Sequence, residues 1–438
     1  MFRVGGQSPW GWQIVKLAFV VQRYGTEILG GSEYHCRLVA ERLASKHDVE
    51  VLTTCARDYV TWKNEYPEGA DRIRGVTVRR FAVSETRDIN SFNQYSDWIF
   101  NNPHRGDDEM EWLRKQGPWS PALLDYITRH QQAYDALIFF TYLYAPTVLG
   151  LQIAPARSIL VPTAHDEPAI HLSIYKDVFT LPAAIAYNTE VERRFLATHF
   201  SIRAIAEETI GCGVDLLHGR HETAREENGE GGPLDELDIA DAKEDDQPLP
   251  PHISGRGAMF RRRHRLYGSF ALYGGRIDPG KGCEELIEYF SSYVHDGGEA
   301  SLILMGVKLM RLPEERWIRF AGLLSERERL QALEAATIVV VPSPYESLSL
   351  LALEAFAVGT PVLANARSEV LVDHCLRSNA GLFYADRDEF VEGLKLLLAD
   401  HRLRSAMGRN GKEYVRRNYR WDVILSKYDR LLARIRKT

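Results

Sequence analysis

Short apolar runs alternate with amphipathic segments along most of this chain, and most of the runs are rich in Val, Ile, Leu and Ala. Each run has the length of a strand that is buried on both faces of a parallel sheet. The runs that we predict to be strands are 16–21, 49–53, 76–81, 136–140, 158–161 and 183–187 in the first half, and 270–274, 301–305, 317–320, 337–341 and 361–364 in the second half.

Helical periodicity fills the spaces between several of these strands. Ser32 is a suitable N-cap for the first predicted helix, and Gly359 followed by Pro361 ends the one that begins near Leu350. The predicted helices are 32–46, 281–295, 325–336, 350–358 and 388–399. Strands and helices in alternation predict an α/β protein with two doubly wound, Rossmann-like domains.

The stretch between the two halves differs from both in composition. Residues 221–246 contain eleven acidic and two basic side chains, and arginines cluster at 256–265. The segment has few apolar residues, and their burial cannot offset the entropy cost of ordering the backbone. We therefore expect a charged, flexible insertion. A lid, or a charged surface for a partner or an anionic membrane, is the alternative. The predicted boundaries are 1–215 for the first domain, 216–266 for the insertion and 267–419 for the second domain.

Composition narrows the functional class only slightly. The chain has 438 residues, of which 26% are charged, and its net charge of -6 gives no sign of nucleic-acid binding. Its five cysteines include no C-x-x-C pair, which favours reduced thiols in the cytoplasm. No apolar stretch approaches the ~20 residues that a membrane-spanning helix needs. We therefore expect a cytoplasmic protein, with peripheral contact at the inner membrane face left open.

A glycine-rich turn follows the predicted strand 270–274. The sequence from Gly274 to Gly282 carries Arg276 and Lys281 and leads into a helix. Glycines let a ligand approach the backbone, and a helix N-terminus flanked by two cations suits a diphosphate. The alternative is an ordinary strand–helix turn with solvated basic side chains.

Two carboxylates follow the predicted strand 337–341. Glu346 lies in the loop after it and Glu354 on the first turns of the next helix. Ligands of open α/β sheets bind at the carboxyl ends of strands, and a carboxylate there can accept hydrogen bonds from sugar or ribose hydroxyls. A solvated helix start, stabilised by the helix dipole, is the alternative.

The first half offers weaker candidates. Gly30 and Gly31 open a helix after the first strand, and His165 follows the strand 158–161. A flexible helix cap and a structural histidine are the alternatives. Asp386 belongs to an Asp-Arg-Asp sequence, which we interpret as a helix cap, so no metal site is predicted.

Taken in order, these motifs resemble the family 4 glycosyltransferases of the GT-B fold. They are Gly-Gly-Ser-Glu at 30–33, His165-Asp166, Gly-Cys-Gly-Val-Asp at 211–215, the turn with Arg276 and Lys281, and the two glutamates eight residues apart. The resemblance implies two domains facing a central cleft and a C-terminal helix, about 420–438, that crosses back to the first domain. It also implies retaining transfer from a nucleoside-diphosphate sugar, without a metal or another cofactor.

The resemblance also implies roles for individual residues. Arg276 and Lys281 would hold the diphosphate, Glu346 would contact the donor sugar, and Glu354 would hold the ribose hydroxyls. Gly31 would lie near the phosphates or the sugar, His165 near the reacting carbon on the acceptor side, and Gly322 and Leu323 near the base. Where the family often has Gly-Phe-Gly-Leu, this chain has donor-site residues Ser347, Leu348, Ser349 and Leu350.

The leading hypothesis is therefore a glycosyltransferase that takes a nucleotide-sugar donor and a glycan, lipid-linked or small-molecule acceptor. A nucleotide-sugar epimerase and an inactive nucleotide-sugar-binding protein are the alternatives, and the oligomeric state stays open. An NAD-dependent enzyme is disfavoured because G-x-G-x-x-G is missing. Acceptor contacts are expected from loops 57–75 and 84–120, whose aromatic residues could stack on sugars or anchor the loops: Tyr59, Trp62, Tyr66, Trp98, Trp112 and Trp119.

Overall fold

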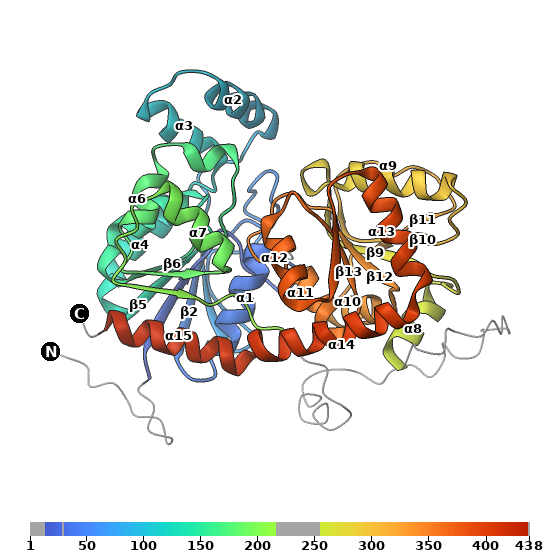
Figure 1. Cartoon of the computed structure of the whole chain (residues 1–438). Helices are drawn as coiled ribbons and strands as arrows, with labels where there is room; N and C mark the ends of the chain where they lie inside the picture. The colour runs from blue at the N-terminus through green and yellow to red at the C-terminus, as the bar shows by residue number, and fades with distance from the viewer. Residues whose placement is uncertain (1–13, 29, 216–254, 437–438) are drawn as a thin grey trace.

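Two twisted sheets lie side by side in the computed structural model, which describes residues 14–28, 30–215 and 255–436 (Figure 1). The first sheet has the order β3-β4-β2-β1-β5-β6-β7-β8, and the second has the order β11-β10-β9-β12-β13-β14. Neighbouring strands are parallel except for the β3–β4 pair. The prediction of an α/β protein with two Rossmann-like domains is confirmed.

The strands of the first sheet are β1 (Lys16–Val20), β2 (Asp48–Thr54), β3 (Gly69–Ile73), β4 (Val76–Phe81), β5 (Ala136–Phe140), β6 (Ser158–Val161), β7 (Ala184–Tyr187) and β8 (Ala206–Thr209). Those of the second sheet are β9 (Phe270–Ile277), β10 (Ser301–Lys308), β11 (Ile318–Gly322), β12 (Ile338–Val341), β13 (Val362–Asn365) and β14 (Gly381–Tyr384).

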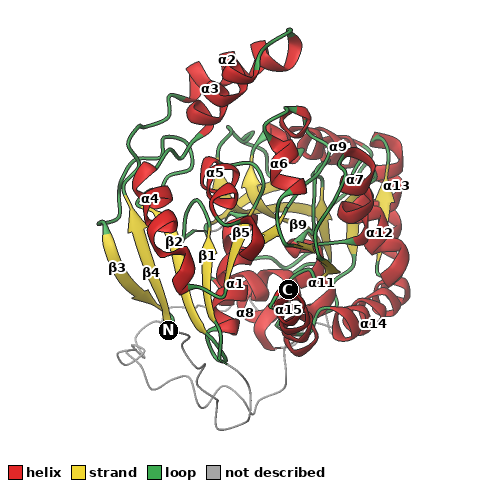
Figure 2. Cartoon of the chain, turned by 90° about the vertical axis from the view of Figure 1, so that its left-hand side faces the viewer, coloured by secondary structure: helices red, strands yellow, loops and turns green. Residues whose placement is uncertain are grey.

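The helices that cover the first sheet or project from it are α1 (Gly31–Leu43), α2 (Ile89–Asn101), α3 (Gly106–Gln116), α4 (Pro121–His130), α5 (Ala145–Ile153), α6 (Tyr175–Thr180) and α7 (Glu190–His199). Those that follow in the chain are α8 (Gly255–Arg263), α9 (Cys283–His295), α10 (Glu326–Ala335), α11 (Leu350–Val358), α12 (Glu369–Ser378), α13 (Arg387–Ala399), α14 (His401–Asn418) and α15 (Trp421–Ile435). Helices α2 and α3 project beyond the first sheet (Figure 2).

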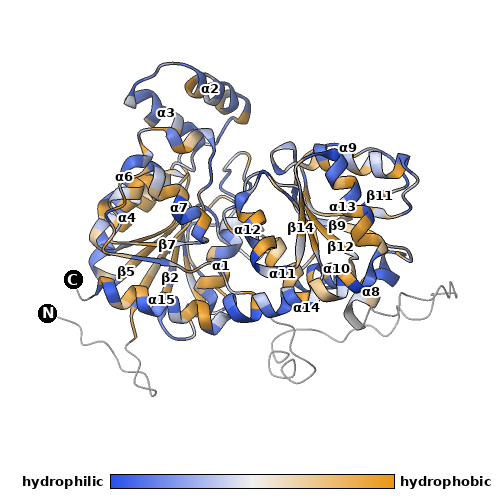
Figure 3. Ribbon diagram, viewed as in Figure 1, coloured by the Kyte–Doolittle hydropathy of each residue, from blue (hydrophilic) through white to orange (hydrophobic). Residues whose placement is uncertain are grey.

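The central strands are apolar on both faces because helices cover both sides of each sheet (Figure 3). Along β1, Leu17 and Phe19 belong to one buried cluster, while Ala18 and Val20 belong to a second cluster on the other face. This two-sided burial explains why the predicted strands read as continuous apolar runs. It also orients the carboxyl ends of β1, β5, β6 and β7 toward one edge of the sheet.

The C-terminal helices α14 and α15 join the two domains. α14 packs against α11 of the second domain, and α15 runs along the first domain and contacts β8 (Figure 1). The backbone N–H of Val214 donates to the carbonyl of Tyr419 at 2.8 Å, and Lys427 Nζ donates to the carbonyl of Thr209 at 2.8 Å. None of the helices in the described part of the chain combines the length and apolar composition needed to span a bilayer.

The second domain begins earlier than the sequence suggested. Most of the predicted insertion, 216–254, lies outside the described residues. Residues 255–266 pack on the second domain, where Phe260 and Arg261 of α8 are buried. The Arg261 guanidinium donates to the carbonyls of Ala335 and Gly268 at 2.9 and 2.7 Å. Backbone carbonyls thus accept hydrogen bonds from an arginine that the sequence had placed in a charged, flexible insertion, and the domain begins before its predicted start at 267.

The docking of α15 gives a stability prediction. Leu431 is fully buried, so Leu431→Ala should lower the free energy of unfolding by about 2–5 kcal/mol through lost apolar contact and a cavity. Urea unfolding followed by circular dichroism measures this loss. Ala433→Ser, an exposed position of the same helix, is the matched control and should leave the midpoint unchanged. Equal midpoints for both variants would show that α15 does not support the first domain.

Candidate functional site

The carboxyl ends of the two sheets face each other and meet through side-chain contacts. The ring of His165, which follows β6, stacks on Tyr345 after β12 with centroids 5.4 Å apart. Asn188, which follows β7, has its side-chain nitrogen 3.4 Å from Ser347 Oγ. A cavity of about 510 Å³ is lined by Thr26, Glu27 and Arg74 of the first domain and by 323–327 of the second. The predicted cleft between the domains is therefore present.

The glycine-rich turn places Lys281 beside the loop that follows β12. Asp278 accepts a hydrogen bond from the backbone N–H of Lys281 at 2.9 Å, which fixes the short helix after β9. Gly282 has φ +73°, and a Cβ there would lie 2.4 Å from the carbonyl oxygen of Pro342, so only glycine fits. This close approach lets Lys281 Nζ donate to Glu346 Oε1 at 2.9 Å. Two predicted site residues thus form a direct ion pair.

Arg276 lies on the same turn and reaches the other domain. Its Nε is 3.3 Å from Asp278 Oδ2, and its guanidinium carbon lies 5.4 Å from the ring centroid of Tyr59. Burial lowers the pKa of Arg276, but Tyr59 and Asp278 outweigh it, so the net pKa is raised and the side chain keeps its charge. A preformed positive charge therefore stands at the mouth of the glycine-rich turn.

Glu354 is buried at the start of α11 and is already paired. Arg329 of α10 donates to Glu354 Oε1 at 2.6 Å and to the hydroxyl of Tyr34 on α1 at 2.7 Å. Burial raises the pKa of Glu354, while the Arg329 guanidinium acts in the opposite direction. The sequence predicted that this carboxylate faces ribose hydroxyls. It did not indicate Arg329, which links Glu354 to Tyr34 of the first domain.

The loop of residues 347–350 bridges the two domains instead of forming an open glycine loop. The carbonyl of Ser347 accepts from the hydroxyl of Thr189 at 3.3 Å, and that of Leu348 lies 2.8 Å from His374 Nε2. Ser349 has φ +59°, a left-handed conformation that glycine adopts more easily, and Leu350 then begins α11. The departure from glycine is therefore accommodated at the cost of backbone strain.

The remaining predicted residues occupy open or accessible positions. Gly31 is the first residue of α1, and a Cβ there would meet nothing within 4 Å; the same holds for Gly322, with φ +86°. Leu323 is exposed and lines the interdomain cavity. His165 is partly buried, with Nε2 3.6 Å from Glu167 Oε1. These positions leave space for a ligand between the domains.

A buried acid, absent from the sequence-based candidates, holds the loop that carries His165. Glu192 on α7 accepts backbone N–H groups of Ala164 and Asn188, each at 2.6 Å, and so ties the loop after β6 to the loop after β7. Burial raises its pKa to about 8 despite these hydrogen bonds. Thr189 caps the same helix, so a Thr-x-x-Glu pattern was the available signal.

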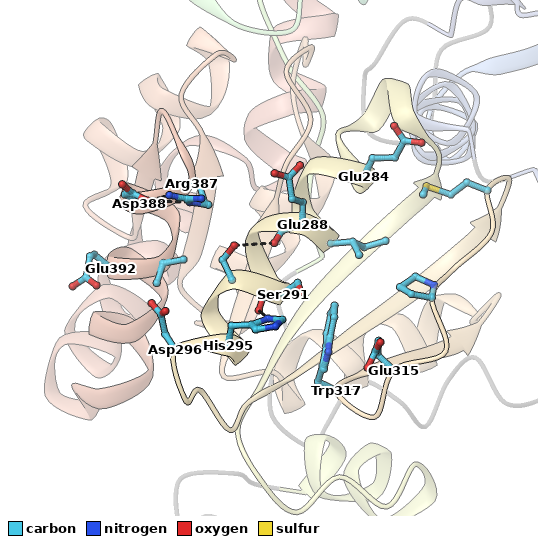
Figure 4. Close-up of a pocket in the computed structure, with 15 residues that line it drawn as sticks. Glu284, Glu288, Ser291, His295, Asp296, Glu315, Trp317, Arg387, Asp388 and Glu392 are labelled. Atoms are coloured by element: carbon cyan, nitrogen blue, oxygen red, sulfur yellow. Dashed lines mark hydrogen bonds and ion pairs between the residues drawn. The ribbon is translucent and has the colours of Figure 1, made fainter.

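A second hollow, of about 900 Å³, lies on the outer side of the second domain (Figure 4). Side chains of α9 and α13 line it together with Trp317, and many of them are acidic. No predicted site residue contributes to it. Asp386, at the start of α13, accepts from the backbone N–H of Glu389, so its interpretation as a helix cap is confirmed. Within residues 14–28, 30–215 and 255–436, no group of three or more His, Cys, Asp or Glu could hold a metal.

Comparisons with known proteins agree with this geometry. Residues 260–414 match the family model described as Glycosyl transferases group 1. Curated relatives include the D-inositol 3-phosphate glycosyltransferase of Corynebacterium efficiens, 29% identical over 185 residues, which are 38% of this chain and 43% of the relative. An uncharacterized glycosyltransferase of Methanocaldococcus jannaschii is 27% identical over 164 residues, 35% of this chain and 42% of the relative. The chain spans less than half the length of these relatives.

Solved structures resemble nearly the whole chain. Sucrose-phosphate synthase from Thermosynechococcus elongatus has a TM-score of 0.66 at 18% identity and covers 96% of this chain and 99% of its own. HepE of Anabaena, solved with UDP and glucose, has a TM-score of 0.64 at 16% identity, with coverage of 96% and 99%. The predicted resemblance is therefore confirmed for the GT-B fold and, over residues 260–414, for the match to group 1 glycosyl transferases. Assignment to family 4 stays a prediction.

The buried pair of Glu354 and Arg329 gives a second stability prediction. Arg329→Met should lower the free energy of unfolding by about 3–5 kcal/mol, because it leaves a buried carboxylate without its cation. Arg327→Met, at an exposed position of the same helix, is the control.

The size of that loss should depend on pH. Without Arg329, the pKa of Glu354 rises further above that of the unfolded chain. Between the two pKa values, the folded variant holds a proton that the unfolded chain has lost, so its stability falls as the pH rises. The difference from wild type should therefore be larger at about pH 8 than at about pH 5. An equal loss at both pH values would contradict ionisation of Glu354 in the folded state.

Proposed function

We propose that this protein transfers a sugar from a nucleoside-diphosphate sugar to a hydroxyl acceptor, with retention of the anomeric configuration. The observation that carries the proposal is the convergence of Arg276, Lys281 and Glu346 at the interdomain edge of the second domain. The match of 260–414 to group 1 glycosyl transferases supports it. So does the UDP in the structure of HepE, which has the same fold.

The leaving diphosphate would be stabilised by charges that are already in position. Arg276 and Lys281 flank the turn, and α9 begins at Cys283 with its free N–H groups and positive dipole end next to that turn. As the bond to the sugar breaks, negative charge develops on the diphosphate. Fixed donors aimed at developing charge reduce the barrier because they need no reorganisation.

Glu346 would act as a positioning group for the donor sugar. Its carboxylate is paired with Lys281, so a diphosphate that attracts Lys281 frees an oxygen of Glu346 for a sugar hydroxyl. Glu354 would hold ribose hydroxyls, with Arg329 keeping it ionised in its buried position. The base would lie near Gly322 and Leu323, and Gly31 would face the phosphates or the sugar across the cleft.

The acceptor would enter from the first domain. His165 stands at the carboxyl end of β6 beside the loop that carries Glu346, and would lie near the reacting carbon. We propose attack on the face from which the diphosphate leaves, without a metal ion, in a cytoplasmic enzyme of family 4. Glycans, lipid-linked saccharides and small molecules are the acceptor classes to test.

Nucleotide binding tests the proposal directly. Thermal shifts are measured with UDP, GDP, ADP, dTDP and NAD, without added metal. One nucleoside diphosphate should stabilise the protein by ~2.7 kcal/mol at ~100 times its dissociation constant. Lys281→Met should abolish that shift because it removes the cation beside the diphosphate.

The matched control is Lys412→Met, an exposed lysine of α14, which should keep the shift. A shift with NAD alone, or with none of the five compounds, would refute the proposed donor class. Conversion of a bound nucleotide sugar to its epimer without any acceptor would instead identify an epimerase.

A further inference from the structure

The side chain of Arg276 crosses the cleft and lies over an aromatic residue of the other domain. Its guanidinium carbon is 5.4 Å from the ring centroid of Tyr59, while Asp278 of its own turn is 3.3 Å from its Nε. The cation therefore has two simultaneous partners, one in each domain. Asp278 holds it toward the second domain, and Tyr59 holds it toward the space between the domains.

Tyr59 belongs to a small aromatic cluster, formed with Trp62 and Tyr144, that is separate from the main cores of the domains. The Tyr59 and Trp62 rings meet edge to face with centroids 5.5 Å apart, and the Trp62 and Tyr144 rings do so at 5.7 Å. Trp62 is buried and donates its indole N–H to the carbonyl of Gln116 at 2.7 Å. The ring of Tyr59 thus rests on an anchored neighbour.

The backbone around Tyr59 is also held in place. Asp58 accepts the backbone N–H groups of Val60 and Thr61 at 3.1 and 2.6 Å. The backbone N–H of Arg87 donates to the carbonyl of Thr61 at 2.7 Å, and the Arg87 guanidinium donates to the carbonyls of Tyr59 and Val60. These hydrogen bonds make the loop a rigid support for the Tyr59 ring.

Three arginines surround Tyr59, and they are bound to different degrees. Arg87 is buried, with its guanidinium carbon 4.9 Å from the ring centroid, and donates to backbone carbonyls. Arg23 lies at 5.4 Å and is paired with Glu33 through two hydrogen bonds of 2.9 and 2.6 Å. Arg276 is 39% exposed and is the one of the three that comes from the second domain. It is therefore the one that a ligand in the cleft can reach.

We propose that Tyr59 is a positioning residue, which, together with the Asp278 contact at Nε, holds the Arg276 guanidinium over the site of the leaving diphosphate. This inference rests on the proposed function. A cation over an aromatic face is held in place but keeps its N–H groups free for an anion. In the absence of Tyr59, the Asp278 contact remains but no longer fixes the guanidinium across the cleft.

A double-mutant cycle tests this role. Tyr59→Leu should lower kcat for donor hydrolysis by about 3- to 30-fold, the range that a cation–π contact allows, with the donor KM changed by less than about threefold. Arg276→Ala should lower kcat by about 100-fold. The double variant should be no slower than Arg276→Ala alone, since Tyr59 acts through Arg276. Tyr59→Phe, which keeps the ring, should restore most of the activity.

The matched control lies outside the loops expected to contact the acceptor. Arg79 lies over the ring of Tyr126 on α4, 5.0 Å from its centroid, so Tyr126→Leu removes a similar contact and should leave kcat unchanged. If the effects of Tyr59→Leu and Arg276→Ala multiply, or if kcat falls equally in Tyr126→Leu, the positioning role is wrong.

The test also separates the two proposals. It is carried out with UDP-, GDP-, ADP- and dTDP-glucose, and the dissociation constants of the four free diphosphates are measured by calorimetry for every variant. If wild type binds none of the diphosphates, the proposed function fails together with this inference. If binding and hydrolysis depend on Arg276 but not on Tyr59, the proposed function stands and this inference alone is wrong.

Discussion

A network of ion pairs and a hydrogen bond connects α1 of the first domain to α10 and α11 of the second, and it holds the two domains in the arrangement on which the site depends. Arg37 of α1 has a fully buried side chain, which pairs with Glu41 at 3.2 Å and also with Glu326 at the start of α10. Arg329, one turn further along α10, joins Tyr34 to Glu354. Buried charges of this kind are costly unless paired, so the domains must meet in a register that satisfies them. That register places Tyr34, three residues after Gly31, against the arginine that pairs with Glu354.

The same principle governs the charges of the cleft itself. Arg276 and Lys281 have carboxylate partners on the second domain, at 3.3 and 2.9 Å. An anionic ligand therefore exchanges partners with these residues and does not meet bare charges. This exchange limits the free-energy cost of desolvating the two cations, because each side chain is already partly desolvated and oriented. The site is thus organised for a diphosphate by interactions within the protein.

The sequence predicted the central strands and the glycine turn, because both depend on local patterns: apolar runs and a Gly-rich sequence at a strand end. It did not predict the edge strands β3 and β8, which are partly exposed and lack apolar runs, or β14, whose apolar run is only four residues long and partly exposed. It missed Arg329, whose bond to Tyr34 joins residues 295 positions apart. It named Tyr59 as a loop aromatic but not its contact with Arg276, which lies in the other domain. No local pattern records such contacts, which arise only when the two sheets face each other.

The crossing of α15 has a consequence for synthesis of the protein. The helix follows the whole second domain in the chain but buries Tyr428 and Leu431 with the apolar cluster that includes β1 and α1. Domains made on the ribosome generally fold in order from the N-terminus. Here the first domain emerges first, yet one of its covering helices is translated only after the whole second domain. Until α15 has been made, the first domain therefore presents an uncovered apolar surface, and its folding cannot be completed before the second domain has been made.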